Sequence, residues 1–552
     1  MITLKGKGVV SGTAIGRLFF YRRTHAAVKK HLIANPEQET ARFWEAQKRA
    51  VDQLQELYDN ALPTVGQASA MIFHIHQMML EDLDFTDAVI RIVQEERMNV
   101  EYAVSKTAAQ LASMFTAMDD PYMQERAADV RDVSQRILQI LMNTQNKIQL
   151  PEEPVILAAK DLIPSETVQL DPKKVLAFVT SEGSANSHTA ILARNMDIPA
   201  IVGAGPHLQK GFHGASTAVD GFTGEVFLYP DAGTIRRIQQ KQDEYEAHRR
   251  ALQEHVGKPN VTLDGQTIQI LANINGNANL HSVLENDAEG IGLFRSESIF
   301  LERDAFPTEE EQYQLYRSVV EAMEGRPVVI RTMDIGADKT PDYFHLPKEE
   351  NPALGYRAIR ICLDRTDIFK TQLRAICRAA ALGHVSLLLP MVSSVWEVQA
   401  ARKIVREVVE ELERENIPHA ADVQLGVMIE TPAAALISDR LAEYADFFSI
   451  GTNDLTQYLL AIDRQNHRIE PYYNPHHPAV LRAIWMVVQN ARKHGVKVGI
   501  CGELAGDLAM TATFLAMGID SLSVAPPLIL PLRSQVRQTD VGKLREDILS
   551  AL

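Results

Sequence analysis

Eight short apolar runs recur at intervals through residues 259–552 of this 552-residue chain. Helical patterns separate most of them, for example 397-EVQAARKIVREVVEELEREN-416. Eight buried strands that alternate with helices are typical of a closed (β/α)8 barrel, because the strands are parallel and the helices cover them. The runs lie at 268–275, 290–297, 327–334, 385–392, 424–431, 447–454, 497–503 and 521–529.

The polar residues that end these runs indicate where chemistry takes place, since a barrel builds its active site at the C-terminal ends of its strands. Glu430 and Asp454 end neighbouring runs, and carboxylate oxygens suit Mg²⁺. The alternative is that both carboxylates pair with arginines. Arg295 and Arg331 end two other runs and Arg464 follows shortly after a third, as recognition of a small substrate with phosphate and carboxylate groups requires.

Further reactive side chains end the runs as well. Cys501 follows the strand residues 497-KVGI-500 and precedes a glycine, so its thiol is expected to face the same end of the barrel and to exchange a proton there. A buried, inert cysteine is the alternative. The three cysteines are too few and too scattered for a disulfide framework or a zinc site. The remaining run-end residues are Glu297, Asp334, Asn453 and Glu503.

The N-terminal half has a different pattern of apolar residues and glycines. Residues 3–22 are predicted as short strands around glycines, and residues 23–145 carry apolar residues at helical spacing, as in 40–62 and 124–143. The strands before residue 22 are too few to close a core, so they are expected to pair with strands after residue 154. The predicted fold is therefore α/β, with residues 1–22 and 146–230 forming one domain and 23–145 a helical bundle inserted into it. Residues 231–258 form a helical linker, and 259–552 the barrel.

One histidine, His188, stands in 181-SEGSANSHTAILARNMDIPAIVG-203. Ser187 or Asn186 can cap a helix that starts there, so the imidazole would lie at a helix N-terminus, which favours an anion such as a phosphoryl group on the ring. Thr189 and Ser187 could each orient a ring nitrogen. A lone histidine is more often an ordinary core or surface residue. Together with the barrel, the hypothesis is that a phosphorylated enol passes its phosphoryl group to His188.

Charge and the N-terminal residues limit the partners. The chain has 56 basic and 71 acidic residues, a formal charge of -15, which disfavours nucleic acid and anionic membranes and allows a basic protein partner. The start MITLKGKGVVSG lacks the apolar core of a signal peptide, and no uninterrupted apolar segment could span a membrane. We expect a cytoplasmic protein without membrane insertion.

These motifs resemble Enzyme I of the bacterial phosphoenolpyruvate-dependent sugar phosphotransferase system, along essentially the full chain. The resemblance is carried by SHTAILARNMDIPAIVG, HQMMLEDLDF, ERAADVRDV, GIGLFRSE, FPTEEEQ, ENPALGYRAIRI, IETPAAA, SIGTNDLTQYLLAIDR and CGELAGD. It implies a phosphoenolpyruvate-protein phosphotransferase that takes the first step of sugar uptake. It also implies a phosphohistidine domain with an inserted bundle that binds the carrier HPr, and a barrel that binds phosphoenolpyruvate and forms a homodimer.

The resemblance also assigns roles to residues. It implies that His188 is phosphorylated and that Cys501 donates the proton that yields pyruvate. Phosphoenolpyruvate would be held by Arg295, Arg331, Asn453, Asp454 and Arg464, and Mg²⁺ by Glu430 and Asp454. Contacts with HPr are expected at Arg126 and at residues 78–85, where Met and Leu alternate with acidic residues.

One segment departs from the family. The usual loop reads Gly-Gly-x-Thr-Ser-His, whereas this chain has Gly183, Ser184, Ala185, Asn186, Ser187 and His188. We expect phosphorylation to persist, and the acceptor to be HPr or a specialised HPr-like domain. A dikinase or synthase acting on phosphoenolpyruvate shares the histidine loop and the barrel but needs an ATP-binding domain, which we do not find. A phosphoenolpyruvate sensor without turnover is the other alternative.

Overall fold

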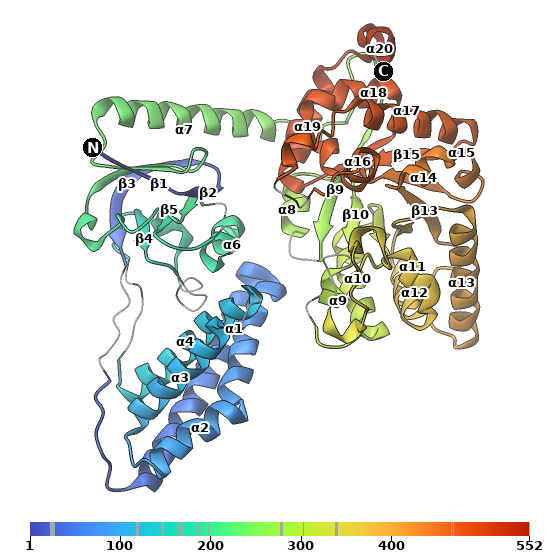
Figure 1. The fold of residues 1–552 in the computed structure, drawn as a ribbon. Coiled ribbons are helices and arrows are strands. Elements are labelled where there is room, and N and C mark those ends of the chain that lie inside the picture. The colour runs from blue at the N-terminus through green and yellow to red at the C-terminus, as the bar shows by residue number, and fades with distance from the viewer. Residues whose placement is uncertain are drawn as a thin grey trace. The chain divides into compact units, whose positions relative to one another are not determined.

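The computed structural model describes residues 1–21, 28–117, 121–144, 148, 150–162, 166, 170–184, 187–196, 198–276, 280–301, 303–336, 341–464, 466 and 468–550. At residues 60–71, 121–125, 128, 188, 191, 195 and 470 only the backbone is described. The chain divides into two compact units, residues 1–249 and 250–552 (Figure 1).

The first unit contains an eight-stranded sheet with the order β1-β8-β7-β3-β4-β5-β6-β2. β1 pairs with β8, β2 with β6, and β3 with both β4 and β7. The prediction that the first strands pair with strands after residue 154 is therefore confirmed. The strands are β1 (Ile2–Lys5), β2 (Lys7–Val10), β3 (Thr13–Phe20), β4 (Val155–Ala159), β5 (Val175–Thr180), β6 (Ala200–Val202), β7 (Ser216–Asp220) and β8 (Glu225–Leu228).

Four helices between β3 and β4 form the bundle, with their own apolar core. α1 starts where the Asn35 side chain accepts a hydrogen bond from the backbone N–H of Gln38, with Pro36 in the first turn. α2 starts where the Asp82 side chain accepts hydrogen bonds from the backbone N–H groups of Asp84 and Phe85. The bundle helices are α1 (Pro36–Glu81), α2 (Leu83–Gln94), α3 (Val100–Thr116) and α4 (Pro121–Leu141).

A short helix, α6 (His188–Asn195), starts at the predicted histidine. Ser187 caps it, since its hydroxyl accepts a hydrogen bond of 3.4 Å from the backbone N–H of Ala190. The other predicted cap, Asn186, and its neighbour Ala185 lie outside the described residues. A longer helix, α7 (Ala232–Gln253), leads towards the second unit.

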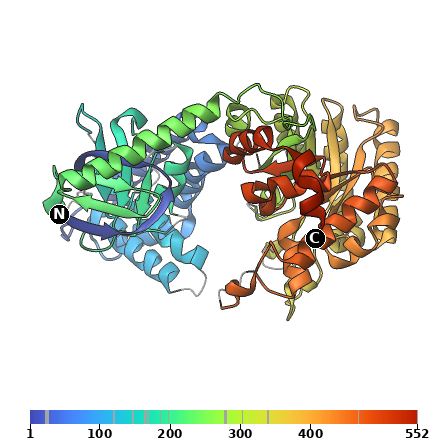
Figure 2. The same ribbon diagram turned by 90° about the horizontal axis from the view of Figure 1, so that it is seen from above.

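The second unit is a closed barrel of eight parallel strands, each predicted from its apolar run (Figure 2). The predicted α/β class with a C-terminal (β/α)8 barrel is thereby confirmed. One large core joins the strands to the surrounding helices. The strands are β9 (Gln269–Asn275), β10 (Ile291–Arg295), β11 (Val328–Arg331), β12 (Val385–Leu389), β13 (Gln424–Ile429), β14 (Phe447–Ile450), β15 (Lys497–Ile500) and β16 (Ser521–Val524).

The helices of the barrel unit vary in length from single turns to the 20 residues of α13. Within the described residues, no helix combines the length and the apolar content that crossing a bilayer requires. The helices are α8 (Leu280–Glu285), α9 (Ser298–Leu301), α10 (Glu309–Ala322), α11 (Ile359–Asp364), α12 (Thr366–Ala380), α13 (Val395–Arg414), α14 (Pro432–Leu436), α15 (Ser438–Leu441), α16 (Thr452–Leu460), α17 (Pro478–Lys493), α18 (Thr511–Met517), α19 (Ile529–Gln538) and α20 (Val541–Ser550).

Candidate functional site

Arg331 is a buried arginine at the end of β11. Its guanidinium contacts Glu297 at 2.7 Å and Asp334 at 3.1 Å. Burial by itself lowers the pKa of Arg331, but the charges of these two carboxylates outweigh it, so the pKa is raised. Arg331 is therefore held as a fixed positive charge.

Arg295 occupies the paired position on the neighbouring strand β10. Its side chain is half-buried, and no carboxylate in the described part of the chain lies within ion-pair distance of it. Burial lowers the pKa of Arg295, and the positive charge of Arg331 lowers it further. The two arginines thus differ, because one is neutralised by the protein and the other is available to an anion.

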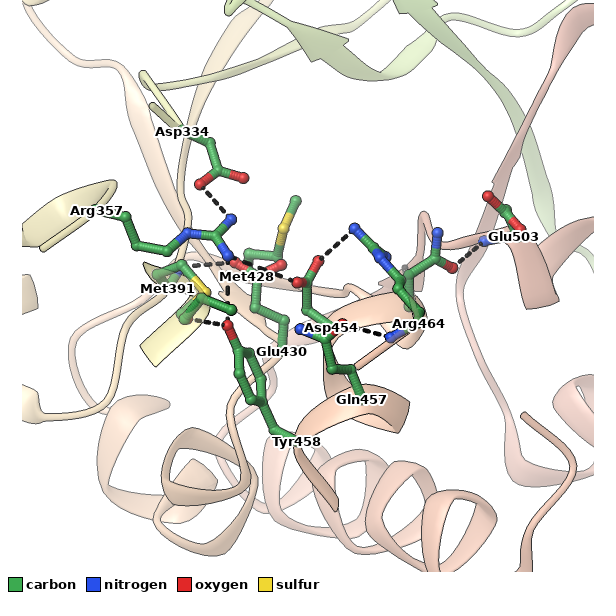
Figure 3. A network of polar contacts seen from close by, with 12 residues as sticks. Asp334, Arg357, Met391, Met428, Glu430, Asp454, Gln457, Tyr458, Arg464 and Glu503 are labelled. Atoms are coloured by element: carbon green, nitrogen blue, oxygen red, sulfur yellow. Dashed lines mark hydrogen bonds and ion pairs between the residues drawn. The ribbon is translucent and has the colours of Figure 1, made fainter. Parts of the chain in front are cut away.

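Glu430 and Asp454 lie together in the polar network of Figure 3. Glu430 follows β13 and is almost fully buried, and its Oε1 accepts a hydrogen bond of 2.6 Å from the backbone N–H of Met391. Burial, followed by the charges of Asp454 and Asp334, raises the pKa of Glu430 to about 8. The negative charges of Asp454 and Asp334 therefore repel a negative charge on Glu430.

This donor set fits a divalent cation of the Mg²⁺ type, which uses one or two carboxylates and leaves its other positions to water and substrate oxygens. Among the described residues, no group of three or more His, Cys, Asp or Glu side chains is placed to hold a metal ion; Glu430 and Asp454 are a pair. A cation between them would relieve the repulsion that raises the pKa of Glu430.

Arg357 was not predicted as a site residue, although it lies in the same network (Figure 3). It is buried, donates to Asp334 at 2.8 Å and to the hydroxyl of Tyr458 at 3.3 Å, and lies 3.9 Å from Asp454. It belongs to the irregular segment between β11 and α11, where no apolar run marks it. The available signal was its place in the loop that follows a barrel strand.

Arg464 and Asn453 complete the network. The Arg464 guanidinium lies 3.6 Å from Asp454, and its backbone N–H donates to the side chain of Gln457. The Oδ1 of Asn453 accepts a hydrogen bond of 2.9 Å from the backbone N–H of Glu503, which orients the amide. These contacts tie the segments that follow β14 and β15 to each other.

Cys501 follows β15 and is buried beside Leu293, Leu388 and Met428. Its Sγ lies 3.7 Å from the carbonyl oxygen of Ile450. Burial raises the pKa of the Cys501 thiol to about 11, so the group is neutral at pH 7. A neutral thiol can donate a proton, whereas it is a poor nucleophile.

Buried donors without a hydrogen-bond partner are a further feature of the mouth. Within the described residues these include the Nε atoms of Arg331 and Arg357. A buried donor left without a partner costs about 1–3 kcal/mol, and oxygens of a bound anion are suitable partners. The mouth thus combines fixed cations, open N–H donors and a neutral acid.

The side chain of His188 lies outside the described residues, although its backbone opens α6. The hydroxyl of Thr189 is buried and donates to the carboxylate of Asp161 at 3.2 Å, while the Ser187 hydroxyl caps α6. Both hydroxyl groups that we expected to orient the imidazole therefore already have partners in the surrounding protein.

Residues 78–85 of the bundle include exposed apolar, buried apolar and exposed acidic side chains. Met78 and Leu83 are 60% and 74% exposed, whereas Leu80 and Phe85 belong to the bundle core. Glu81, Asp82 and Asp84 are exposed around them. Arg126 on α4 contacts Asp129 at 2.9 Å. The apolar residues of this segment thus divide between the core and the surface.

Comparison with known proteins gives consistent matches along the whole chain. Residues 249–541 match the model described as PEP-utilising enzyme, PEP-binding domain, residues 5–126 the N-terminal model and residues 151–224 the mobile-domain model of such enzymes. The phosphoenolpyruvate-protein phosphotransferase of Bacillus sp. (strain S) is 41% identical over 99% of this chain and 96% of its own length. That of Bacillus subtilis (strain 168) is 40% identical over 100% of this chain and 97% of its own. An NMR structure of an Enzyme I protein, 34% identical, aligns with 44% of this chain and 99% of its own at a TM-score of 0.38.

Proposed function

Since this chain belongs to the family of phosphoenolpyruvate-protein phosphotransferases, we propose that its barrel binds phosphoenolpyruvate and that His188 receives the phosphoryl group and passes it to HPr or to an HPr-like carrier domain. Pyruvate is the second product. The protein then takes the first step of phosphoenolpyruvate-dependent sugar uptake, and it works in the cytoplasm.

The observation that carries this proposal is the difference between Arg295 and Arg331. Arg331 already has two carboxylate partners, while Arg295 has none in the described chain and its charge is disfavoured by burial and by Arg331. The charges of Glu297 and Glu503 favour the charged form of Arg295 but do not outweigh burial and Arg331, so a bound dianion would stabilise it further. The phosphate and carboxylate of phosphoenolpyruvate are therefore assigned to Arg295, Arg331, Arg464 and Asn453, with Arg357 added from the network.

Transfer breaks the bond between phosphorus and the enol oxygen and forms a bond between phosphorus and a ring nitrogen of His188. The electron pair of the broken bond stays on the enolate, which needs a proton on carbon. Cys501 is assigned as the donor, because its thiol is neutral at pH 7 and lies in the barrel mouth. The arginines stabilise the negative charge on the enolate oxygen.

Glu430 and Asp454 are the residues that would hold Mg²⁺. When bound there, Mg²⁺ supplies positive charge next to the substrate oxygens. The backbone N–H of Met391 holds Oε1 of Glu430, and Arg357 and Arg464 lie 3.9 and 3.6 Å from the carboxylate of Asp454.

The carrier is proposed to dock on the bundle, where Met78 and Leu83 are exposed among acidic side chains. Exposed methionine and leucine side chains adapt to a partner surface, and acidic neighbours favour a basic partner. The altered loop before His188 leads us to propose a specialised carrier, and the barrel is proposed to form a homodimer.

The test is mass analysis of the purified full chain after incubation with phosphoenolpyruvate and Mg²⁺. We expect a single phosphoryl group on the peptide that contains His188, no label in a His188→Ala variant, and release of pyruvate. Addition of an HPr-like carrier should remove the label, and ordinary HPr from a relative is compared with it. Labelling of a different peptide, or label in the alanine variant, would contradict the assignment of His188.

A labelled protein that ordinary HPr cannot discharge would point to the specialised carrier. Equal transfer rates to an ordinary and a specialised HPr would rule that preference out. Absence of any label, together with measurable binding of phosphoenolpyruvate, would favour the sensor function instead.

A further inference from the structure

Gln372 is a buried amide on the inner face of α12, outside the residues assigned to substrate. Its side chain is 1% exposed and makes three hydrogen bonds. Its Oε1 accepts from the backbone N–H of Met333 at 2.9 Å, and its Nε2 donates to the Ser296 hydroxyl at 3.0 Å and to the Tyr316 hydroxyl at 3.1 Å. One buried side chain thus joins two strand ends and a second helix.

The two strand ends that Gln372 joins carry Arg295 and Arg331, which are assigned to phosphoenolpyruvate. Ser296 lies between Arg295 and Glu297, and its hydroxyl donates to the carbonyl oxygen of Arg331 at 2.8 Å. Met333 lies two residues beyond Arg331. The amide therefore bonds to both segments that carry the paired arginines.

On its other side the amide is fixed to α10. The Tyr316 hydroxyl donates to Gln312 at 3.3 Å, and Gln312 donates to the carbonyl oxygen of Pro307. These two side chains are at most 1% exposed. Hydrogen bonds between buried groups are directional and are costly to break, so they fix distances that apolar packing leaves adjustable.

We propose that Gln372 is a positioning residue that sets the separation of Arg295 and Arg331 by hydrogen-bonding the ends of β10 and β11. This inference rests on the proposed function, because the two arginines are assigned there to phosphoenolpyruvate. Gln372 itself does not contact the substrate.

The test compares the full-length variants Gln372→Leu, Ser296→Ala and Tyr316→Phe with the wild type. KM and kcat are measured from pyruvate release, phosphoenolpyruvate binding by calorimetry, and folding by thermal melting. Gln372→Leu keeps the volume and removes all three hydrogen bonds. Tyr316→Phe removes only the link to α10 and is the matched control.

We expect KM to rise about tenfold in Gln372→Leu, since small displacements of binding groups have effects of this size, while kcat changes little. Ser296→Ala should raise KM by a smaller factor. Tyr316→Phe should leave KM within about twofold of the wild type, although it lowers the melting temperature as any lost buried hydrogen bond does.

An unchanged KM in Gln372→Leu overturns the inference, and so does an equal rise in Tyr316→Phe, because a general packing defect would affect both. If Gln372→Leu does not fold, an unchanged KM in Ser296→Ala overturns it instead. A wild-type chain that neither binds phosphoenolpyruvate nor releases pyruvate would refute the proposed function and this inference together.

Discussion

The two paired arginines show how one residue type serves different purposes at neighbouring positions. Arg331 compensates Glu297 and Asp334, so its removal takes away the ion-pair partner of the buried Glu297, while Asp334 keeps its contact with Arg357. Arg295 compensates no carboxylate in the described chain, so its removal affects a ligand more than the fold. Residue type alone does not distinguish these cases, whereas the local charges do.

We therefore expect Arg295→Leu to raise KM for phosphoenolpyruvate by about 10- to 100-fold, the effect of losing hydrogen bonds to a charged group. Its melting temperature should stay close to that of the wild type. Arg331→Leu should lose about 3–5 kcal/mol of folding free energy in addition, because it breaks a buried ion pair. Kinetics and denaturant unfolding of both variants check this, and equal destabilisation by the two would contradict it.

Cys501 is the second residue with a definite expected effect. Cys501→Ala should lower kcat for pyruvate release by about 10²–10⁴-fold, the usual contribution of a general acid, with little change in KM. Cys377→Ala, in a buried cysteine on α12, is the control and should retain activity.

The expected pH dependence follows from the proposed role of Cys501 as proton donor, in which the protonated thiol is the active form. Its activity is lost only as the pH rises through about 11, so Cys501 should cause no decline in kcat between pH 7 and 9. An ordinary thiol, with a pKa of about 8.5, would lose most of its proton by pH 9. A decline in kcat between pH 7 and 9 that is absent in Cys501→Ser would show that the thiol loses its proton in this range and would contradict the prediction.

At the scale of elements, the loops that follow the barrel strands position the side chains of the candidate site. Met391, whose N–H binds Glu430, has a φ of 57°, and Ala358, next to Arg357, has a φ of 54°. Such left-handed conformations cost about 1–3 kcal/mol for residues other than glycine and cluster at functional sites. The backbone is therefore strained at Met391, which contacts Glu430, and at Ala358, which follows Arg357.

The junction between β14 and α16 contains Gly451. Its backbone conformation is ordinary, but a Cβ atom there would lie 2.8 Å from Oε2 of Glu430. Glycine is needed for space, since it lets the carboxylate approach the backbone closely.

Gly451→Ala is therefore expected to displace Glu430 and to weaken Mg²⁺ binding about tenfold, as changes to groups that orient a metal ligand do. Calorimetry with Mg²⁺ and the Mg²⁺ concentration for half-maximal activity both measure this. Gly542→Ala on α20 is the control, because its Cβ would lie no closer than 3.5 Å to its neighbours. Unchanged Mg²⁺ binding in Gly451→Ala would argue against Glu430 as a ligand.

At the scale of the whole molecule, the two units have separate apolar cores. The large barrel core belongs to residues 250–552, while the bundle core lies in residues 1–249. Each core closes on elements of its own unit, so each unit has what it needs to fold alone.

We expect each of the fragments 1–249 and 250–552 to fold without the other and to unfold cooperatively. Phosphoenolpyruvate with Mg²⁺ should stabilise only fragment 250–552, by about 2.7 kcal/mol at a ligand concentration 100 times Kd. Calorimetry of both fragments tests this. Stabilisation of fragment 1–249 by these ligands would contradict the assignment of substrate binding to the barrel.

Much of the fold followed from local patterns. The eight apolar runs predicted the eight barrel strands, because buried parallel strands need nearly continuous apolar residues, and the start of α6 followed from a serine that can cap it. Arg295, Arg331, Glu430, Asp454 and Cys501 could be named as site candidates because each directly follows, or ends, such a run.

What the sequence by itself determined is the order of strands and helices and the polar residues at the strand ends, since periodicity and capping are local. Only the tertiary structure decided that Arg331 is already neutralised, that Arg357 joins the network from an irregular segment, and that Gln372 links two strand ends from a helix. These contacts join residues far apart in the chain. Their geometry exists only once the barrel has closed, and burial then decides which charges are compensated and which are left for a ligand.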